Sequence, residues 1–352
     1  MGSPYMPAGG YVSDYLAFWA IWLLVVGATV LFLRRTRGRR GAVRLVAGNL
    51  LVLACIAWTA AVAAETYLRW FYDTTDQYGL MLTNRAWFMR HIHENNAGVR
   101  DVDFVPEKRP GTVRVACVGD SFTMGWGVDD PANAFPQRIG AVLAARAPGH
   151  FEVRNYGIPG LTTREEIQPI EDLARAGGTD HVILGYCLND PDDLLPPDRW
   201  FDREAAPGIP WMKQTRSFLA DYLWFHLRLA KDPRVRDFFS YEKEAYDDPK
   251  IWAVQCDQFR RIAATCRAAS IRLDVIVFPF FQVWGEDYPF ATCHDRVVAA
   301  WKALGVDAID LRDCYRGIPG ADLVVNRFDA HPNERAHEIA ARTILARVFG
   351  VR

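Results

Sequence analysis

Four short polar blocks in this 352-residue sequence contain the residue types needed for nucleophilic attack on a carbonyl group. The first block, GDSFTMG, contains Ser121, and the last block, DAHPN, contains Asp329 and His331. A serine hydroxyl becomes a strong nucleophile when an imidazole takes its proton, and an acidic side chain holds that imidazole in one tautomer. We therefore predict that Ser121 is the nucleophile, that His331 is the base, and that Asp329 orients His331.

The two middle blocks supply groups that suit the negative charge of a tetrahedral intermediate. They read NYGIPG, which ends at Gly160, and ND, which begins at Asn189. Preorganised N–H donors at the developing oxyanion contribute strongly to acyl-transfer catalysis. We predict an oxyanion hole formed by the backbone N–H groups of Ser121 and Gly160 and by the side-chain amide of Asn189. Trp126 and Tyr186 flank these blocks, and contact with a sugar ring of the substrate or ordinary packing are the two roles open to them.

The blocks fall at the ends of predicted strands, or before the last predicted helix, within an alternating pattern of strands and helices. Apolar runs predict strands at residues 113–118, 151–155, 181–184, 273–278 and 308–311. The segments between and after them predict helices at residues 134–146, 164–176, 251–268, 296–304 and 334–349. This alternation is typical of an α/β fold in which helices cover both faces of a parallel sheet. Since parallel strands all end at one sheet edge, we expect the four blocks to meet there.

Taken in order, the four blocks resemble those of the SGNH, or GDSL-type, hydrolases. The matching positions are Gly119 to Gly125, Asn155 with Gly160, Asn189 with Asp190, and Asp329 with His331 to Asn333. The resemblance covers about residues 111–350. It implies a flavodoxin-like three-layer α/β/α domain and an esterase that works through an acyl-enzyme without a metal or an organic cofactor.

The sequence departs from the usual pattern of that family at two positions. The last pair is spaced D-x-H, whereas many members have D-x-x-H, and Phe328 occupies the place of that aspartate. Leu188 stands where a glycine often precedes the Asn-Asp pair. A Ser–His dyad, with backbone carbonyls orienting His331, is therefore the alternative to a triad that includes Asp329.

Residues 1–64 have a different composition from the rest of the chain. Residues 15–33 and 45–64 are apolar runs without a charged side chain, and both are long enough to cross a bilayer. Six arginines lie between them at residues 34–44, and basic loops favour the cytoplasmic side. We predict a transmembrane hairpin in the cytoplasmic membrane, with a cytoplasmic arginine-rich loop and the catalytic domain on the periplasmic or extracellular side.

The remaining boundaries follow from composition. Residues 65–110 are interpreted as a connector, and residues 111–352 as the hydrolase domain. An aromatic-rich insertion at residues 196–249 interrupts this domain, and we interpret it as a helical excursion, a substrate lid or a surface that contacts the membrane. The formal net charge of −1 gives no general attraction to nucleic acid. No Cys or His spacing indicates a metal site, and Cys293 and Cys314 are the candidate disulfide pair.

Together these features predict a membrane-anchored serine esterase that removes O-acetyl or other short acyl groups from cell-envelope or exported carbohydrate. The expected partners are an ester-bearing glycan and the lipid bilayer. One alternative is an O-acyltransferase that uses the same site to acylate a glycan hydroxyl. The other is a non-catalytic glycan-binding or assembly module.

Overall fold

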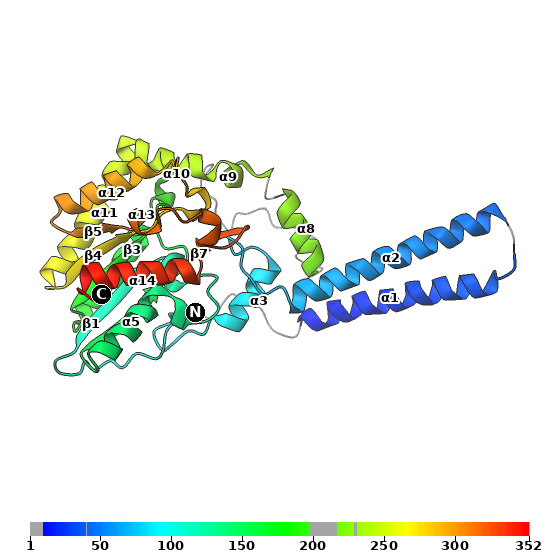
Figure 1. Cartoon of the computed structure of the whole chain (residues 1–352), viewed down its shortest axis with the longest axis horizontal. Coiled ribbons are helices and arrows are strands. Elements are labelled where there is room, and N and C mark those ends of the chain that lie inside the picture. Colours follow the sequence, from blue (N-terminus) through cyan, green and yellow to red (C-terminus); the bar gives the residue numbers. More distant parts are fainter. Residues whose placement is uncertain (1–9, 40, 197–216, 229–230, 352) are drawn as a thin grey trace. The chain divides into compact units, whose positions relative to one another are not determined.

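The computed structural model describes residues 10–39, 41–196, 217–228 and 231–351, and these form two compact units (Figure 1). We call the first the hairpin unit; it comprises Met1–Thr74, Gly79–Arg90 and Arg203–Asp232. We call the second the sheet unit; it comprises Thr75–Tyr78, His91–Asp202 and Pro233–Arg352. The chain thus passes between the two units several times, and each unit is described separately below.

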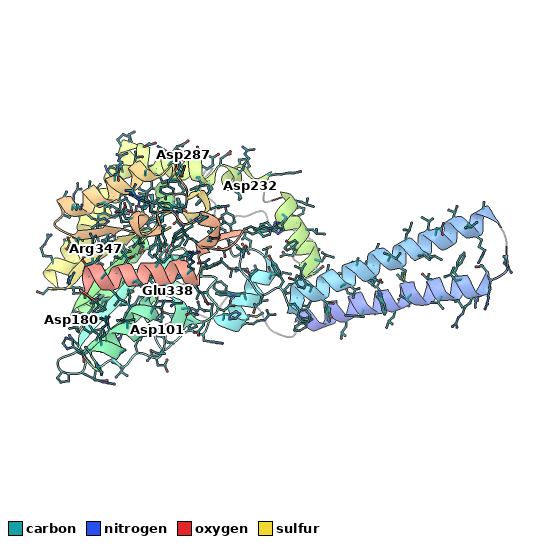
Figure 2. The ribbon with its side chains drawn as sticks, in the orientation of Figure 1. Asp101, Asp180, Asp232, Asp287, Glu338 and Arg347 are labelled. Carbon is teal, nitrogen blue, oxygen red and sulfur yellow. The ribbon has the colours of Figure 1, made fainter. Side chains whose placement is uncertain are left out.

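Two long apolar helices dominate the hairpin unit. Helix α1 spans Gly10–Arg35 and helix α2 spans Ala42–Trp70, so both extend beyond the predicted apolar runs. They pack against each other, and the indole N–H of Trp22 donates to the Thr59 hydroxyl at 2.9 Å. Figure 2 shows their side chains projecting outward from the pair. Their membrane-length segments have mean hydropathies of 2.5 and 2.1 and are almost entirely unburied within the protein, which makes them candidate membrane spans.

The rest of the hairpin unit packs around the end of α2. Helices α3 (Leu82–His91) and α8 (Phe218–Arg228) share a small apolar cluster with α2. The buried Glu65 carboxylate accepts hydrogen bonds from Arg69 at 2.7 Å, from the Ser217 hydroxyl at 2.9 Å and from the Phe218 backbone N–H at 3.1 Å. The predicted connector is therefore helical at its start and again at α3. Residues 197–216 of the predicted insertion lie outside the described residues.

A five-stranded parallel sheet forms the centre of the sheet unit. Its strand order is β2-β1-β3-β4-β5, and every neighbouring pair is parallel. The strands are β1 (Val113–Gly119), β2 (Phe151–Gly157), β3 (His181–Tyr186), β4 (Arg272–Val277) and β5 (Asp307–Asp310). All five predicted strands are thus present, each within two residues of its expected bounds. Most strand residues are buried, as expected for a parallel sheet that is covered on both faces.

Helices cover the sheet in two layers, so the predicted three-layer α/β/α fold is confirmed. The layer helices are α5 (Phe135–Arg146), α6 (Thr163–Ala176), α11 (Pro249–Ala268), α12 (Ala291–Ala303) and α14 (Glu334–Val348). Helices α5 and α14 pack together as one layer, visible in front of the sheet in Figure 1, and α6, α11 and α12 pack together as the other. Cys293 and Cys314 are both free, so the candidate disulfide is not formed.

Short elements connect the layers and complete the sheet edge. The short helices are α4 (Ser121–Met124), α9 (Pro233–Arg236), α10 (Phe238–Asp247), α13 (Arg312–Tyr315), η1 (Pro131–Asn133), η2 (Asp192–Leu194), η4 (Phe281–Val283) and η5 (Gly320–Asp322). A separate antiparallel pair is formed by β6 (Val324–Asn326) and β7 (Asp329–Pro332). These two strands are absent from the strands predicted by the sequence, because segments of three or four residues are too short for a recognisable alternation.

Candidate active site

Ser121 directly follows the carboxyl end of β1, at the edge of the sheet. In the order β2-β1-β3-β4-β5, connections leave β1 and β3 toward opposite faces, and ligands bind at such a switch point. Asp120 caps the short helix α4, since its side chain accepts a hydrogen bond from the Phe122 N–H at 2.9 Å. Gly119 permits this sharp turn, because a Cβ there would lie 2.7 Å from the Gly185 carbonyl oxygen.

The structure brings Ser121, His331 and Asp329 into one hydrogen-bonded line. His331 Nε2 lies 2.8 Å from Ser121 Oγ, and His331 Nδ1 lies 2.5 Å from Asp329 Oδ1. Asp329 and His331 are two residues apart on β7, and strand residues at this spacing point to the same side. The D-x-H spacing therefore works because the pair is on a strand. The Asp329 carboxylate contacts Nδ1, as the triad hypothesis requires and the dyad alternative does not.

The second oxygen of Asp329 receives two further donors. The Thr75 hydroxyl and the Trp126 indole N–H both donate to Asp329 Oδ2, the latter at 3.1 Å. Burial by itself would raise the pKa of Asp329, but the nearby His331 and the hydrogen bonds from His331 and Thr75 outweigh burial and lower this pKa. The carboxylate is therefore charged at neutral pH and is able to stabilise an imidazolium at His331.

Thr75 is not among the predicted site residues, and Trp126 takes the packing role of the two that its position left open. Thr75 is 254 residues from Asp329 in the sequence, and nothing in its local sequence marks it as part of a site. The Trp126 ring is only 1% exposed and stacks on His331, with ring centroids 5.1 Å apart and planes at 21°. This burial contradicts the expectation that Trp126 contacts a sugar, because no face of the ring is open to substrate.

The expectation that Tyr186 contacts substrate is contradicted as well. Tyr186 is the last residue of β3, and its side chain is fully buried. Its hydroxyl lies 2.7 Å from the Tyr246 hydroxyl, which donates to the Leu188 carbonyl at 3.0 Å. A residue beside a polar block can point either toward the sheet edge or into a helix layer, and Tyr186 points into a helix layer.

The predicted oxyanion donors lie in turns that follow β1, β2 and β3. Asn189 is half-buried; its Oδ1 is enclosed without a hydrogen-bond partner in the described part of the chain, and its Nδ2 is bonded to none of the described residues. Gly160 occupies an exposed turn with φ 79°, a conformation that favours glycine. Gly157 has its N–H engaged by Asn155 Oδ1 at 2.8 Å. Ser121 N–H, Gly160 N–H and the Asn189 amide remain the predicted donors.

Buried carboxyl groups lie behind the nucleophile. Burial raises the pKa of Asp120 to about 6, and burial with repulsion from Asp120 raises the pKa of Glu166 well above its ordinary value. Burial and repulsion from Glu166 also raise the pKa of Asp190. Neither carboxyl oxygen of Glu166 has a hydrogen-bond partner among the described residues. The raised pKa values favour the protonated forms of Glu166 and Asp190, whereas the carboxylate that contacts the His331 imidazole belongs to Asp329.

A model of the GDSL-like Lipase/Acylhydrolase family matches residues 117–339, which include Ser121, Asn189 and His331. No curated protein matches the chain.

Several solved structures are similar to the chain. TesA is 13% identical with a TM-score of 0.42, over 66% of this chain and 95% of TesA. The acetylxylan esterase Axe2 from Geobacillus stearothermophilus is 17% identical with a TM-score of 0.43, over 70% of this chain and 99% of Axe2. A two-domain esterase (CEX) active on acetylated mannans is 14% identical with a TM-score of 0.40, over 66% of this chain and 47% of CEX.

Proposed function

The chain belongs to the GDSL-like lipase/acylhydrolase family and is an ester-hydrolysing enzyme, and from this premise we propose that it removes short acyl groups from carbohydrate with Ser121 as the nucleophile. One observation carries the proposal. Ser121 Oγ, the His331 imidazole and the Asp329 carboxylate form a continuous line with separations of 2.8 Å and 2.5 Å. These distances let one proton move from the nucleophile to the base while the carboxylate stabilises the resulting imidazolium.

The proposed reaction has two halves. Ser121 Oγ attacks the ester carbonyl while His331 Nε2 takes the hydroxyl proton, and the oxyanion accepts hydrogen bonds from the predicted donors. The tetrahedral intermediate expels the alcohol, which takes the proton from His331 and leaves an acyl ester on Ser121. A water molecule then attacks this ester, with His331 again as base, and releases the carboxylic acid and the free serine.

Burial of the site supports a short acyl group. Ser121 is 5% exposed and His331 is 6% exposed. The Phe122 and Trp126 rings pack against the imidazole, with centroids 5.5 Å and 5.1 Å from it. Large side chains thus enclose the reacting atoms, and this enclosure favours a short acyl group such as acetyl over a fatty acyl chain.

A cavity at the same sheet edge supports a sugar as the other part of the substrate. This cavity of about 730 Å³ lies beyond the carboxyl ends of β4 and β5. Its lining includes the rings of Trp284 and Tyr288 and the charged groups of Arg312, Arg316 and Glu286. Aromatic rings with a few polar groups suit a ligand that has apolar and hydrogen-bonding faces, as a sugar does.

The test of this function uses the full-length protein in detergent micelles. We expect hydrolysis of p-nitrophenyl acetate that is lost in Ser121→Ala, slower hydrolysis of the butyrate and octanoate esters, and acetate release from O-acetylated xylan or mannan oligosaccharides. Faster cleavage of the longer esters would contradict the short-acyl proposal. Acetate that appears on an added sugar acceptor instead of in solution would identify an acyltransferase. A folded wild type without activity on any of these would leave the binding-module hypothesis.

We also propose that α1 and α2 anchor the enzyme in the cytoplasmic membrane with the sheet unit on the outer side. The support is the exposure of their apolar side chains and the arginines between the two helices. Trypsin added to intact spheroplasts tests the orientation. We expect cleavage within the sheet unit and protection of residues 34–44, and the reverse pattern would contradict it.

A further inference from the structure

We propose that the segment Thr75–Tyr78, here called the strap, positions the Asp329 carboxylate for catalysis, with Thr75 as the positioning residue. This inference rests on the proposed function of Ser121, His331 and Asp329. The strap belongs to the sheet unit, but the residues on both sides of it, Thr74 and Gly79, belong to the hairpin unit. It lies outside residues 117–339, the segment that the family model matches.

The strap contacts the β6–β7 hairpin at three points around Asp329. The Thr75 hydroxyl donates to Asp329 Oδ2. The Asn326 side-chain amide donates to the Thr75 carbonyl at 3.0 Å, and the Gln77 backbone N–H donates to the Phe328 carbonyl at 3.1 Å. Since Asn326 ends β6 and Phe328 lies in the turn that leads into β7, the strap holds both the carboxylate and the backbone that carries it.

Packing leaves Thr75 little freedom to move away from Asp329. The Thr75 side chain is fully buried. Gly127, which follows the serine block, has φ 78°, and a Cβ there would lie 2.9 Å from Thr75 Oγ1 and 2.4 Å from a Val325 methyl carbon. Thr75 is therefore enclosed between the loop after α4 and the β6–β7 hairpin.

The buried Asp329 carboxylate has few hydrogen-bond donors, so the hydrogen bond from the Thr75 hydroxyl is important for its charge. Asp329 is 1% exposed, and besides His331 its side-chain hydrogen bonds come from two neutral groups, Thr75 and Trp126. Water cannot readily replace a donor in so enclosed a place, and an underbonded buried carboxylate is costly. Loss of the Thr75 hydroxyl should therefore weaken the support of the imidazolium, which forms only during the reaction.

The test compares Thr75→Val with Thr75→Ser and a matched control in the full-length protein. Thr112→Val is the control, because Thr112 is also buried in the sheet unit and donates to the Gly149 carbonyl at 2.9 Å, away from the site. For p-nitrophenyl acetate we expect Thr75→Val to lower kcat about tenfold, the effect of losing one hydrogen bond to a charged group, with KM within twofold. We expect Thr75→Ser to restore most of kcat and Thr112→Val to match the wild type.

A second variant tests the strap without touching the carboxylate. Asn326→Asp can still accept from the Phe328 N–H, which lies 2.7 Å from Asn326 Oδ1, but it cannot donate to the Thr75 carbonyl. We expect a smaller fall in kcat than for Thr75→Val, and little further fall when the two changes are combined. Wild-type kcat in Thr75→Val, or equal losses in the serine and valine variants, would overturn the proposal.

Failure of the proposed function is distinguishable from failure of this inference. A wild type without Ser121-dependent turnover would contradict the function alone. In that case the role of the strap is tested by the chemical shift of the low-field ¹H NMR resonance of the proton between His331 Nδ1 and Asp329. We expect this resonance to shift in Thr75→Val and not in Thr112→Val, and an unchanged resonance in Thr75→Val would overturn the inference.

Discussion

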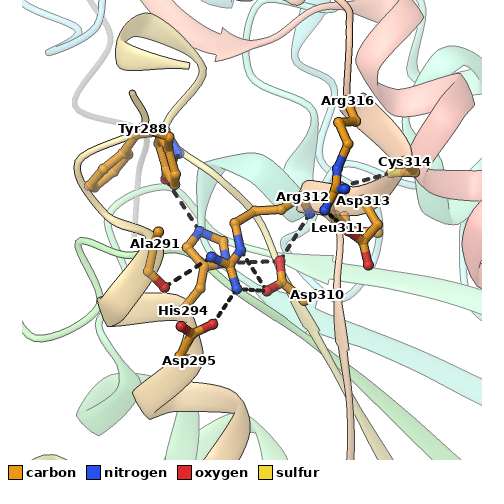
Figure 3. A network of polar contacts seen from close by, with 11 residues as sticks. Tyr288, Ala291, His294, Asp295, Asp310, Leu311, Arg312, Asp313, Cys314 and Arg316 are labelled. Atoms are coloured by element: carbon orange, nitrogen blue, oxygen red, sulfur yellow. Dashed lines mark hydrogen bonds and ion pairs between the residues drawn. The ribbon is translucent and has the colours of Figure 1, made fainter. Parts of the chain in front are cut away.

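Two of the buried His–Asp pairs in the sheet unit share the contact between His Nδ1 and an Asp oxygen but differ in their surroundings. His331 Nδ1 contacts Asp329, and His294 Nδ1 lies 3.0 Å from Asp310 Oδ1 (Figure 3). They differ at the second ring nitrogen. His331 Nε2 faces the Ser121 hydroxyl, whereas His294 Nε2 lies 3.3 Å from the Tyr288 hydroxyl. The Tyr288 oxygen in turn accepts from the Phe280 N–H at 2.9 Å, so this second chain ends in the backbone.

The two carboxylates differ as well. Arg312 donates to Asp310 Oδ2 at 2.7 Å and to Asp295 at 2.6 Å, and it ties the end of β5 to α12 (Figure 3). Burial lowers the pKa of His294 despite its bond to Asp310, so this imidazole is neutral at neutral pH. A His–Asp pair alone therefore does not make a site. The two pairs differ in the group at the far ring nitrogen, which is a serine hydroxyl in one and a tyrosine hydroxyl in the other, and in the presence of Arg312 on one carboxylate.

Replacing each histidine by glutamine should give the largest contrast. We expect His331→Gln to lower kcat by about 10³-fold or more, because the base is lost, with little change in Tm. We expect His294→Gln to retain kcat within a few-fold and to lower the free energy of unfolding by about 2 kcal/mol, because a buried network is broken. Ester hydrolysis and thermal unfolding measure the two effects. Comparable losses of kcat in both variants would remove the distinction between the pairs.

The aspartates test the same contrast with the histidines in place. We expect Asp329→Asn to lower kcat by about 10²- to 10³-fold, since an amide can hold the imidazole in the wrong tautomer and cannot stabilise an imidazolium. Asp310→Asn should leave Arg312 with one fewer carboxylate partner and lower Tm while kcat stays near wild type. Steady-state kinetics beside a melting curve checks both, and a kcat in Asp329→Asn close to wild type would support the dyad alternative.

Replacing a tryptophan by phenylalanine near each His–Asp pair should give a smaller difference in kcat. Trp126→Phe keeps a ring against His331 but removes the N–H that donates to Asp329 Oδ2, so we expect kcat to fall about five- to tenfold. Trp301 is fully buried on α12, the helix that carries His294, and its N–H has no hydrogen-bond partner among the described residues. Trp301→Phe is the matched control, and we expect it to hydrolyse p-nitrophenyl acetate at the wild-type rate. A loss in the control as large as that in Trp126→Phe would refute a specific role for the Trp126 N–H.

The stability contributed by the carboxyls behind Ser121 and that contributed by Asp310 should depend on pH in opposite directions. Carboxyls behind Ser121 have raised pKa values, so their contribution to stability is present at low pH and is lost as pH rises through their folded pKa, about 6 for Asp120. Burial opposes ionisation of Asp310, but bonds from His294 and Arg312 outweigh it and lower the pKa of Asp310. Its contribution is therefore present above the unfolded value and is lost as pH falls toward the folded pKa.

Glu166→Gln tests the first of these pH effects. The amide cannot ionise, so we expect the fall in unfolding free energy between pH 5 and pH 8 to shrink by about 1 kcal/mol relative to wild type. Glu107 is exposed, and Glu107→Gln serves as the control, for which no change is expected. Denaturant unfolding at several pH values makes the comparison, and identical pH dependence in Glu166→Gln and wild type would contradict it.

The fold class and the candidate membrane spans were predictable from the amino-acid sequence. A parallel sheet that is buried on both faces requires continuous apolar runs, and these runs predicted all five strands. The polar blocks after β1 and β3 identified the sheet edge, because parallel strands all end on one side. The two apolar runs before residue 65 predicted α1 and α2, although the helices extend further than those runs.

The side chains that support the reacting residues could not be predicted from the sequence, because they are brought together by long-range packing. Residue type does not say where a side chain points, so substrate contact and packing were both open for Trp126 and Tyr186, and their burial decides for packing. The β6–β7 pair, which makes the D-x-H spacing work, depends on pairing between strands too short to recognise. Thr75 meets Asp329 across 254 residues, and such a contact is set by packing of the folded chain, which local sequence does not encode.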